Sequence, residues 1–135
     1  MSDPALSPLD TVKAFMRAME TKNYDAAMPL VADDCEYENI PMAKVRGPAA
    51  VRAVLEPFFA PVIENQFVIT RFAVNGSVVF MERLDRHRLA DRWVELPVTG
   101  VWEVRDGRIA VWRDYFDVGM LVTRWPELQA AMAAA

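Results

Sequence analysis

The chain has 135 residues, a length that suits one domain with a single hydrophobic core. Its composition, 53% hydrophobic and 25% charged, is that of an ordinary soluble domain, and a net charge of −4 without a dense run of Lys or Arg argues against a nucleic-acid partner. One cysteine excludes an intrachain disulfide, and one histidine without a Cys/His cluster argues against a metal site. We therefore expect a single domain over residues 1–135.

The N-terminal residues give no sign of export or of membrane insertion. The segment M-S-D-P-A-L-S-P lacks the basic and then apolar order of a signal peptide, and no apolar run approaches the ~20 residues of a membrane span. A cytoplasmic protein without membrane contact is therefore expected.

The first half of the chain carries helix signals. Ser7 before a proline is typical of a helix start, and apolar residues at helical spacing predict a helix over residues 8–21. Asn23 can cap a short second helix over residues 24–30. A Gly-Pro pair opens a third helix, which we expect to cover residues 48–61.

The second half changes to the two-residue period of strands. Alternating residues predict a meander of four strands, over residues 66–74, 77–89, 92–104 and 108–116. Two of its three joints, N-G and D-G, are the strongest short hairpin signals. We expect the C-terminal tail to form a short helix that acts as a lid or cap. Helices followed by a meander predict an α+β fold, with N-terminal helices packed on a curved antiparallel or mixed sheet that forms a cone with an interior pocket.

The stretch W-R-D-Y-F-D places a carboxylate among aromatic residues of the last predicted strand. Trp112, Asp114 and Phe116 share one face of that strand, because side chains alternate between faces. A buried carboxylate is costly unless it is paired or hydrogen-bonded. Asp114 therefore either pairs with Arg113 or a helix N-terminus, or points into a pocket that is apolar overall and holds a few polar groups.

A second polar set lies on the predicted strand over residues 77–89. Arg83, Asp85 and His87 are two residues apart and share one face, which would equally suit a ladder of solvated surface charges. Tyr37 and Asn39 have the same spacing in Y-E-N-I-P and are a weak signal when taken alone. The sequence has no G-x-S-x-G elbow, Gly-rich phosphate loop or C-x-x-C motif, so any catalysis would depend mainly on carboxylates.

Taken together, Y-E-N-I-P, R-L-D and W-R-D-Y-F-D resemble the limonene-1,2-epoxide hydrolase family, in this order and after two N-terminal helices. The resemblance covers about residues 8–120. It implies a cystatin-like, nuclear transport factor 2-like cone of the SnoaL-like superfamily, usually dimeric, that acts on a small apolar epoxide. The catalytic residues that it implies are Tyr37, Asn39, Arg83, Asp85 and Asp114.

The chemistry of epoxide opening is consistent with these residues. The attacking water needs a base, and the leaving oxygen needs an acid; Arg83 can hold two carboxylates whose mutual repulsion drives their pKa values apart. Electrostatics alone permits either assignment of the two roles. The resemblance implies Asp114 as the base, with Tyr37 and Asn39 holding the water, and Asp85 as the acid. Such a reaction needs no metal, cofactor or covalent intermediate.

Aligned apolar positions predict the wall of the substrate pocket, although each would equally suit plain core. The expected substrate-binding residues are Phe58, Val62, His87, Leu96, Val98 and Phe116. His87 stands where the family more often has an apolar residue. It either makes the pocket more polar or narrower, or sits at the rim, hydrogen-bonded and inert.

Two other functions remain open at this stage. A ketosteroid-isomerase-like or polyketide-cyclase-like enzyme needs a base beside a carbonyl-binding donor, but gives no role to an arginine between two aspartates. A non-catalytic small-molecule-binding protein is the other alternative, because this fold hosts many functions. We also expect a twofold dimer, because apolar residues on the convex face of the sheet are typical of an interface. The residues expected there are Val101, Ile109, Val111 and Tyr115.

Overall fold

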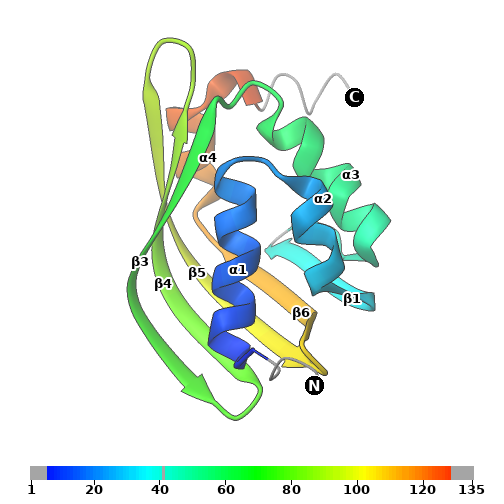
Figure 1. Ribbon diagram of the computed structural model, residues 1–135. Helices are drawn as coiled ribbons and strands as arrows, with labels where there is room; N and C mark the ends of the chain where they lie inside the picture. The colour runs from blue at the N-terminus through cyan, green and yellow to red at the C-terminus, as the bar shows by residue number, and fades with distance from the viewer. Residues whose placement is uncertain (1–5, 41, 129–135) are drawn as a thin grey trace.

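The computed structural model describes residues 6–40 and 42–128, whose elements Figure 1 shows. The helices are α1 (Pro8–Glu20), α2 (Tyr24–Ala27), the short 3-10 helix η1 (Met28–Leu30), α3 (Pro48–Phe59) and α4 (Val118–Arg124). The strands are β1 (Val31–Ile40), β2 (Val45–Arg46), β3 (Glu64–Asn75), β4 (Val78–Arg88), β5 (Trp93–Arg105) and β6 (Arg108–Tyr115). The expected helices and strands are confirmed to within a few residues at their ends. The last residues of the expected C-terminal cap lie outside the described residues.

Local sequence explains where the first helices begin. The Ser7 hydroxyl accepts a hydrogen bond from the Asp10 backbone N–H at 3.1 Å, and the Asn23 side chain does the same for Ala26. The stripe of apolar side chains on α1 is buried against the sheet, where Phe15 meets a pair of stacked tryptophans edge-on. Each such buried side chain contributes roughly 1.5–3 kcal/mol, which fixes α1 across the concave face.

All six strands form one open sheet in the order β2-β1-β6-β5-β4-β3. The meander β3-β4-β5-β6 is antiparallel, whereas β1 joins β6 in parallel. Neither this parallel pairing nor the short strand β2 was predicted from the sequence. The parallel pairing matters for function, because it aligns Tyr37 with Trp112 and Asn39 with Asp114.

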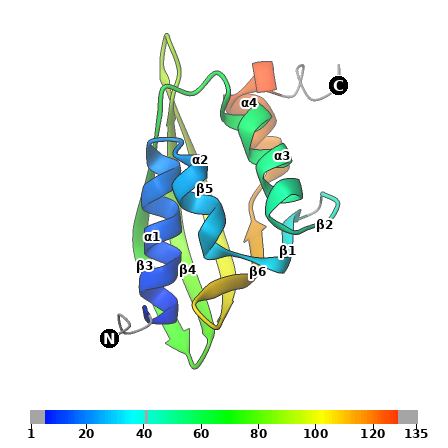
Figure 2. The same cartoon turned by 45° about the vertical axis from the view of Figure 1, so that its right-hand side comes forward.

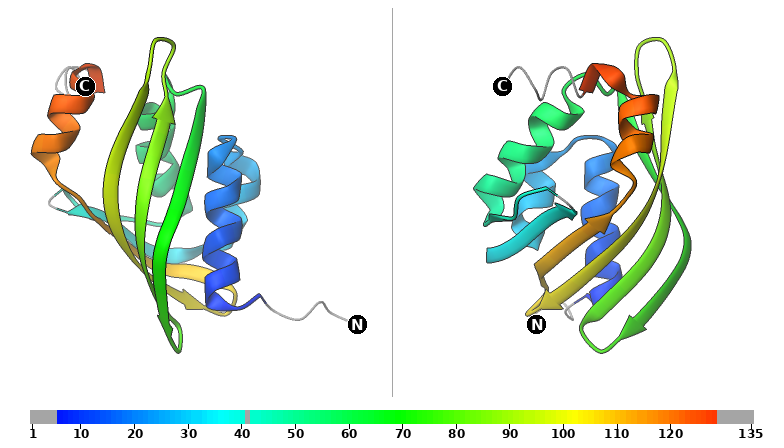
Figure 3. Two further views of the ribbon diagram at one scale, coloured as in Figure 1. Left: turned by 90° about the vertical axis from the view of Figure 1, so that its left-hand side faces the viewer. Right: turned by 180° about the vertical axis from the view of Figure 1, so that it is seen from behind.

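The sheet is strongly curved, and the helices lie on its concave side (Figures 1 and 2). Register shifts in β1, β3 and β6 are consistent with this curvature, because a β-bulge bends its strand. In Figure 2, α1 and α2 lie to one side of the interior and α3 and α4 to the other. The left panel of Figure 3 shows the opposite, outer face of β3, β4 and β5, which no described helix covers. No helix in the described part of the chain has the length and apolar character to cross a membrane.

The D-G turn lies where the sequence predicts it, and the N-G turn is shifted by one residue. Asp106 and Gly107 both have positive φ, 54° and 74°, as the predicted D-G turn requires. At the first hairpin the two-residue loop is Gly76-Ser77, one residue later than the N-G signal, because Asn75 still pairs with Val78.

One of the residues expected on the convex face of the sheet lies in the core instead. Ile109 is buried in the core with 1% of its surface exposed, whereas Tyr115 is 44% exposed on the outer face. The cause is a β-bulge: Val111 pairs with Glu103 while Ile109 pairs with Val104, so Ala110 is an extra residue that breaks the alternation.

Candidate active site

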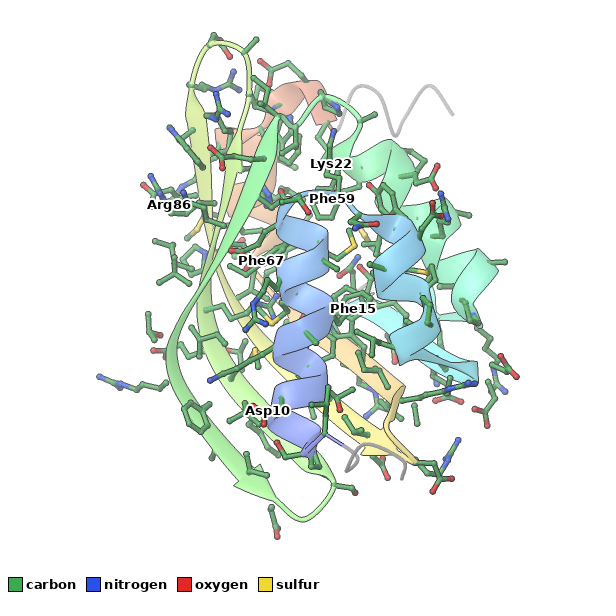
Figure 4. The ribbon with its side chains drawn as sticks, in the orientation of Figure 1. Asp10, Phe15, Lys22, Phe59, Phe67 and Arg86 are labelled. Carbon is green, nitrogen blue, oxygen red and sulfur yellow. The ribbon has the colours of Figure 1, made fainter. Side chains whose placement is uncertain are left out.

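The polar side chains of β4 face the interior of the cone. Arg83, Asp85 and His87 are 3%, 6% and 2% exposed, so the alternative of a solvated charge ladder is wrong. Arg86, which lies between them on the opposite face, projects away from the helices in Figure 4. Its guanidinium lies 4.4 Å from the ring centre of Trp93 and pairs with Glu95.

Arg83 forms the centre of a buried group with two carboxylates. Its Nε and Nη2 donate to the two oxygens of Asp85 at 2.9 and 3.0 Å, and its Nη1 and Nη2 donate to the two oxygens of Asp114 at 3.2 and 3.1 Å. Burial alone would lower the pKa of Arg83, but the two carboxylates raise it, so the guanidinium remains charged. One planar cation therefore holds two carboxylates in fixed, bidentate geometry.

Asp114 is 6% exposed and has three hydrogen-bond donors around it. Besides Arg83, the Trp112 indole Nε1 donates to its Oδ1 at 2.9 Å. Burial raises the pKa of Asp114, while the Arg83 charge opposes the rise and Asp85 adds to it. The alternative partner considered from sequence, Arg113, pairs instead with Glu38 at 3.4 Å.

Tyr37 and Asn39 lie beside Asp114 because of the parallel pairing of β1 and β6. The Asn39 Nδ2 donates to the Tyr37 hydroxyl at 2.8 Å, and the Tyr37 ring stacks on Trp112 with centroids 4.1 Å apart. Burial, and then the negative charge of Asp114, raise the pKa of Tyr37, so its hydroxyl stays protonated. The five residues that the sequence analysis proposed as catalytic are thus brought to one cavity.

Gly100 makes room for this group and was not predicted. It lies opposite Asp114 on β6 and Met81 on β4, and a Cβ on it would come within 2.5 Å of Arg83 Nη1 and 2.9 Å of Asp114 Oδ1. The nearby Trp102 Nε1 is buried and has no hydrogen-bond partner among the described residues. The only sequence signal is a glycine inside a strand, which indicates a close approach of another group.

The cavity has a volume of about 50 Å³, and its wall is mainly apolar and aromatic. Of the expected wall residues, five line it: Phe58, His87, Leu96, Val98 and Phe116. Val62 does not line the cavity but is buried in the core after α3. The sequence does not distinguish the two positions, because an apolar residue near the end of a helix can face either the core or the cavity.

Sequence reasoning missed the wall that the helices supply. The side chains that complete the wall come mainly from α1, α3 and β3, with two tryptophans from β5 and β6. They are Phe15, Met16, Met19, Leu55, Phe59, Phe67, Trp102 and Trp112. Figure 4 shows three of these phenylalanines, from three different elements, around the same interior. The apolar stripe of α1 was visible in the sequence, but its spacing alone does not say that part of it borders a cavity.

His87 lies in the apolar wall of the cavity. Its ring is 5.4 to 6.4 Å, centre to centre, from four aromatic side chains, and its Nδ1 lies 2.7 Å from Asn65 Oδ1. Burial, and then the charge of Arg83, lower its pKa to about 4, so it is neutral at neutral pH. One expectation from the sequence was that His87 is hydrogen-bonded at the rim of the pocket. The side chain is hydrogen-bonded, but it is buried in the wall and not at the rim.

Among residues 6–40 and 42–128 no group of three or more His, Cys, Asp or Glu side chains could hold a metal ion. The chemistry that the site offers is that of two carboxyl groups, one cation and the neutral donors around them. Such a set can accept a proton at one point and donate a proton at another.

A curved sheet with helices on its concave side, around an apolar cavity with a polar group in its wall, is the cone fold of the nuclear transport factor 2-like class. Residues 6–127 match the limonene-1,2-epoxide hydrolase catalytic domain, and the chain belongs to the limonene-1,2-epoxide hydrolase family. It is 36% identical, over 107 residues, to the epoxide hydrolase EphG of Mycobacterium tuberculosis, covering 79% of this chain and 71% of that protein.

Solved structures agree with this assignment. The structure of an LEH-like epoxide hydrolase from M. tuberculosis is 31% identical with a TM-score of 0.77, covering 94% of this chain and 95% of that one. A protein from Shewanella denitrificans described as a SnoaL-like polyketide cyclase has a TM-score of 0.79 at 14% identity, covering 89% and 97%. The second likeness shows the shared cone fold alone.

Proposed function

We propose that this protein is a cofactor-independent epoxide hydrolase that adds water to an epoxide in one push–pull step and gives a vicinal diol. The observation that carries the proposal is the bidentate clamping of Asp85 and Asp114 by one buried arginine in the wall of an apolar cavity. Two carboxyl groups held this way supply a base and an acid to one substrate. Membership in the epoxide hydrolase family supports the same reaction.

The neighbours of each carboxyl group support the division of roles. Asp114 lies next to Asn39 and near Tyr37, whereas Asp85 lies between Phe67 and Leu96 on the adjacent strands. A water at Asp114 can accept a hydrogen bond from the Tyr37 hydroxyl and donate to Asn39 Oδ1 and to Asp114. That leaves one lone pair for attack on carbon. An epoxide against the apolar wall presents its oxygen to Asp85.

The raised pKa of Asp114 is compatible with its role as the base. A carboxylate with a raised pKa accepts a proton more readily, provided that it is ionised when the substrate binds. Three donors, two from Arg83 and one from Trp112, favour the ionised form of Asp114. In the proposed reaction Asp85 is the acid, and it supplies the proton that the epoxide oxygen takes up.

The reaction balances without any other reactant. The water oxygen bonds to one ring carbon as the carbon–oxygen bond of the epoxide breaks, one water proton goes to Asp114, and the Asp85 proton goes to the leaving oxygen. The product is a diol, and the pair still carries one proton, now on Asp114. That proton moves to Asp85 before the next turnover.

An isotope experiment separates direct attack by water from attack by Asp114 on carbon, which would form an ester. In a single turnover with excess enzyme in oxygen-18 water, we expect the label in the first diol formed. The reason is that Tyr37 and Asn39 provide two hydrogen-bonding groups beside Asp114 that suit a bound water. Mass spectrometry of the diol gives the measurement, and unlabelled diol incubated with the enzyme in the same water controls for exchange. An unlabelled first diol with label on Asp114 would contradict the mechanism but not the hydrolase activity.

We also propose that the protein is a twofold dimer joined through the outer face of the sheet. Phe80 and Tyr115 are nearly half exposed on that face, beside the partly exposed Val101 and Val111. Apolar side chains in such a position are typical of a subunit interface. Light scattering at micromolar concentration should give twice the monomer mass, and Phe80→Glu should shift it toward the monomer. A monomer mass for the unmodified protein at all micromolar concentrations would contradict the proposal.

A further inference from the structure

The inner end of the cavity wall contains a short chain of hydrogen bonds that ends at His87. The Asn65 side chain is buried, its Nδ2 donates to the backbone oxygen of Met19 at 3.1 Å, and its Oδ1 lies 2.7 Å from His87 Nδ1. The reverse orientation of the amide would place Asn65 Oδ1 against the Met19 carbonyl oxygen. Two acceptors cannot share a hydrogen bond, so the Met19 carbonyl fixes the amide with its oxygen toward the imidazole.

The orientation of Asn65 determines which nitrogen of His87 carries the proton. Because Asn65 Oδ1 can only accept, Nδ1 has to donate. A neutral imidazole has one N–H, so a proton on Nδ1 leaves Nε2 with a free lone pair. The lowering of the His87 pKa by its burial and by Arg83 supports the neutral form.

The free lone pair of Nε2 belongs to a side chain that lines the substrate cavity. Among the described residues Nε2 has no hydrogen-bond partner, and the ring is surrounded by Phe58, Phe59, Phe67 and Trp125. A polar atom in an apolar wall is costly unless something hydrogen-bonds to it. Since no described side chain donates to Nε2, its donor is whatever occupies the cavity, a water molecule in the empty site or a group of the substrate in the complex.

We propose that His87 Nε2 accepts a hydrogen bond from a hydroxyl group of the substrate, so that the preferred substrate is a hydroxylated epoxide and not a hydrocarbon epoxide. This inference rests on the proposed function, because it concerns the substrate of the same site. His87 lies two residues beyond Asp85 on β4, or about 7 Å along the strand. The hydroxyl group is therefore several bonds away from the epoxide ring.

The tautomer of His87 can be measured without any activity. The chain contains a single histidine, so protein labelled with ¹⁵N-histidine gives one imidazole whose two nitrogens can be assigned by NMR. We expect a protonated Nδ1 and an unprotonated Nε2 at neutral pH. In the Asp114→Asn variant, which should leave the epoxides unopened, addition of 4-(hydroxymethyl)cyclohexene oxide should move the Nε2 resonance, and addition of 4-ethylcyclohexene oxide should leave it in place. A proton on Nε2, or equal shifts with both compounds, would overturn the inference.

Kinetics with the same two epoxides test the preference directly. Their side arms have the same number of heavy atoms, and only one of them can donate a hydrogen bond. We expect the wild-type kcat/KM to be about 10-fold or more higher for the hydroxymethyl compound, because the ethyl side arm displaces water from the acceptor without replacing its hydrogen bond. In His87→Leu the preference should disappear or reverse. Phe58→Leu, which changes the shape of the wall beside His87, should affect both substrates in parallel.

The outcomes distinguish a failure of the hydroxyl preference from a failure of the proposed hydrolase function. Equal wild-type kcat/KM values for the two epoxides overturn the hydroxyl preference while leaving the hydrolase function in place. A wild-type enzyme that opens no epoxide overturns the proposed function, and the NMR experiment then still decides whether His87 accepts a ligand hydroxyl. The wild-type comparison requires no variant, so it stands even if His87→Leu does not fold.

Discussion

Replacement of Asp114 by asparagine is expected to lower kcat by about 10³-fold or more, within the range that a lost general base accounts for. The amide keeps the size of the side chain but cannot accept the proton of the attacking water. Asp85→Asn should have a similar effect, because it leaves the epoxide oxygen without its acid. The double variant should be little worse than either single variant, since the two groups act as one unit around Arg83. Diol formation by each variant, with circular dichroism to establish folding, gives the measurement.

A matched control is available on the surface of the same protein. Asp34 pairs with Arg105, whose Nη2 donates to both of its oxygens at 3.0 Å, but the Asp34 side chain is 71% exposed. Asp34→Asn therefore breaks an aspartate–arginine pair outside the cavity, and kcat should not change, since exposed pairs contribute little. Near-wild-type turnover by Asp85→Asn would show that the assignment of the acid is wrong.

The fold was largely predictable because its signals are local. Helix starts at Ser7 and Asn23, the change from helical to strand period, and the D-G turn all depend on neighbouring residues, and each was placed correctly. The parallel pairing of β1 with β6 was not predictable in this way, because it joins segments far apart in the sequence. The bulge at Ala110 also escaped prediction, and it turned Ile109 from the expected outer face into the core.

The candidate catalytic residues were accessible to sequence reasoning because their spacing is that of strands. Arg83 and Asp85, like Tyr37 and Asn39, lie two residues apart, so any strand places each pair on one face. That these two faces meet at Asp114 follows from strand order, which no local pattern contains. The resemblance to a known family supplied that information.

The orientation of His87 and the need for Gly100 could not be predicted for a different reason. Both depend on contacts between residues that the sequence keeps apart, such as Asn65 with Met19 and Gly100 with Arg83. A glycine in a strand and a histidine on an inward face are visible signals. What they contact becomes visible only once the strands are packed.

Substitution of Gly100 by alanine should lower kcat by about 10²-fold and should move the acid limb of the pH–activity profile to higher pH. A Cβ at this position would lie 2.5 Å from Arg83 Nη1 and 2.9 Å from Asp114 Oδ1, so the guanidinium has to move away from Asp114. A displacement of this size at a catalytic group is enough for such a loss. KM should change much less than kcat, because the apolar wall is left in place.

The shift in pH dependence distinguishes positioning of Arg83 from a general loss of packing. Burial already raises the pKa of Asp114, and the Arg83 charge is what limits the rise. With the cation displaced, the pKa of Asp114 rises further, so the acid limb of the kcat/KM profile, which reports ionisation of the base, moves to higher pH. Part of the lost activity should therefore return as the pH is raised. Gly119→Ala, which adds the same methyl group to α4 outside the cavity wall, should leave the profile unchanged. A lower kcat with an unshifted acid limb would mean that Gly100 serves packing alone.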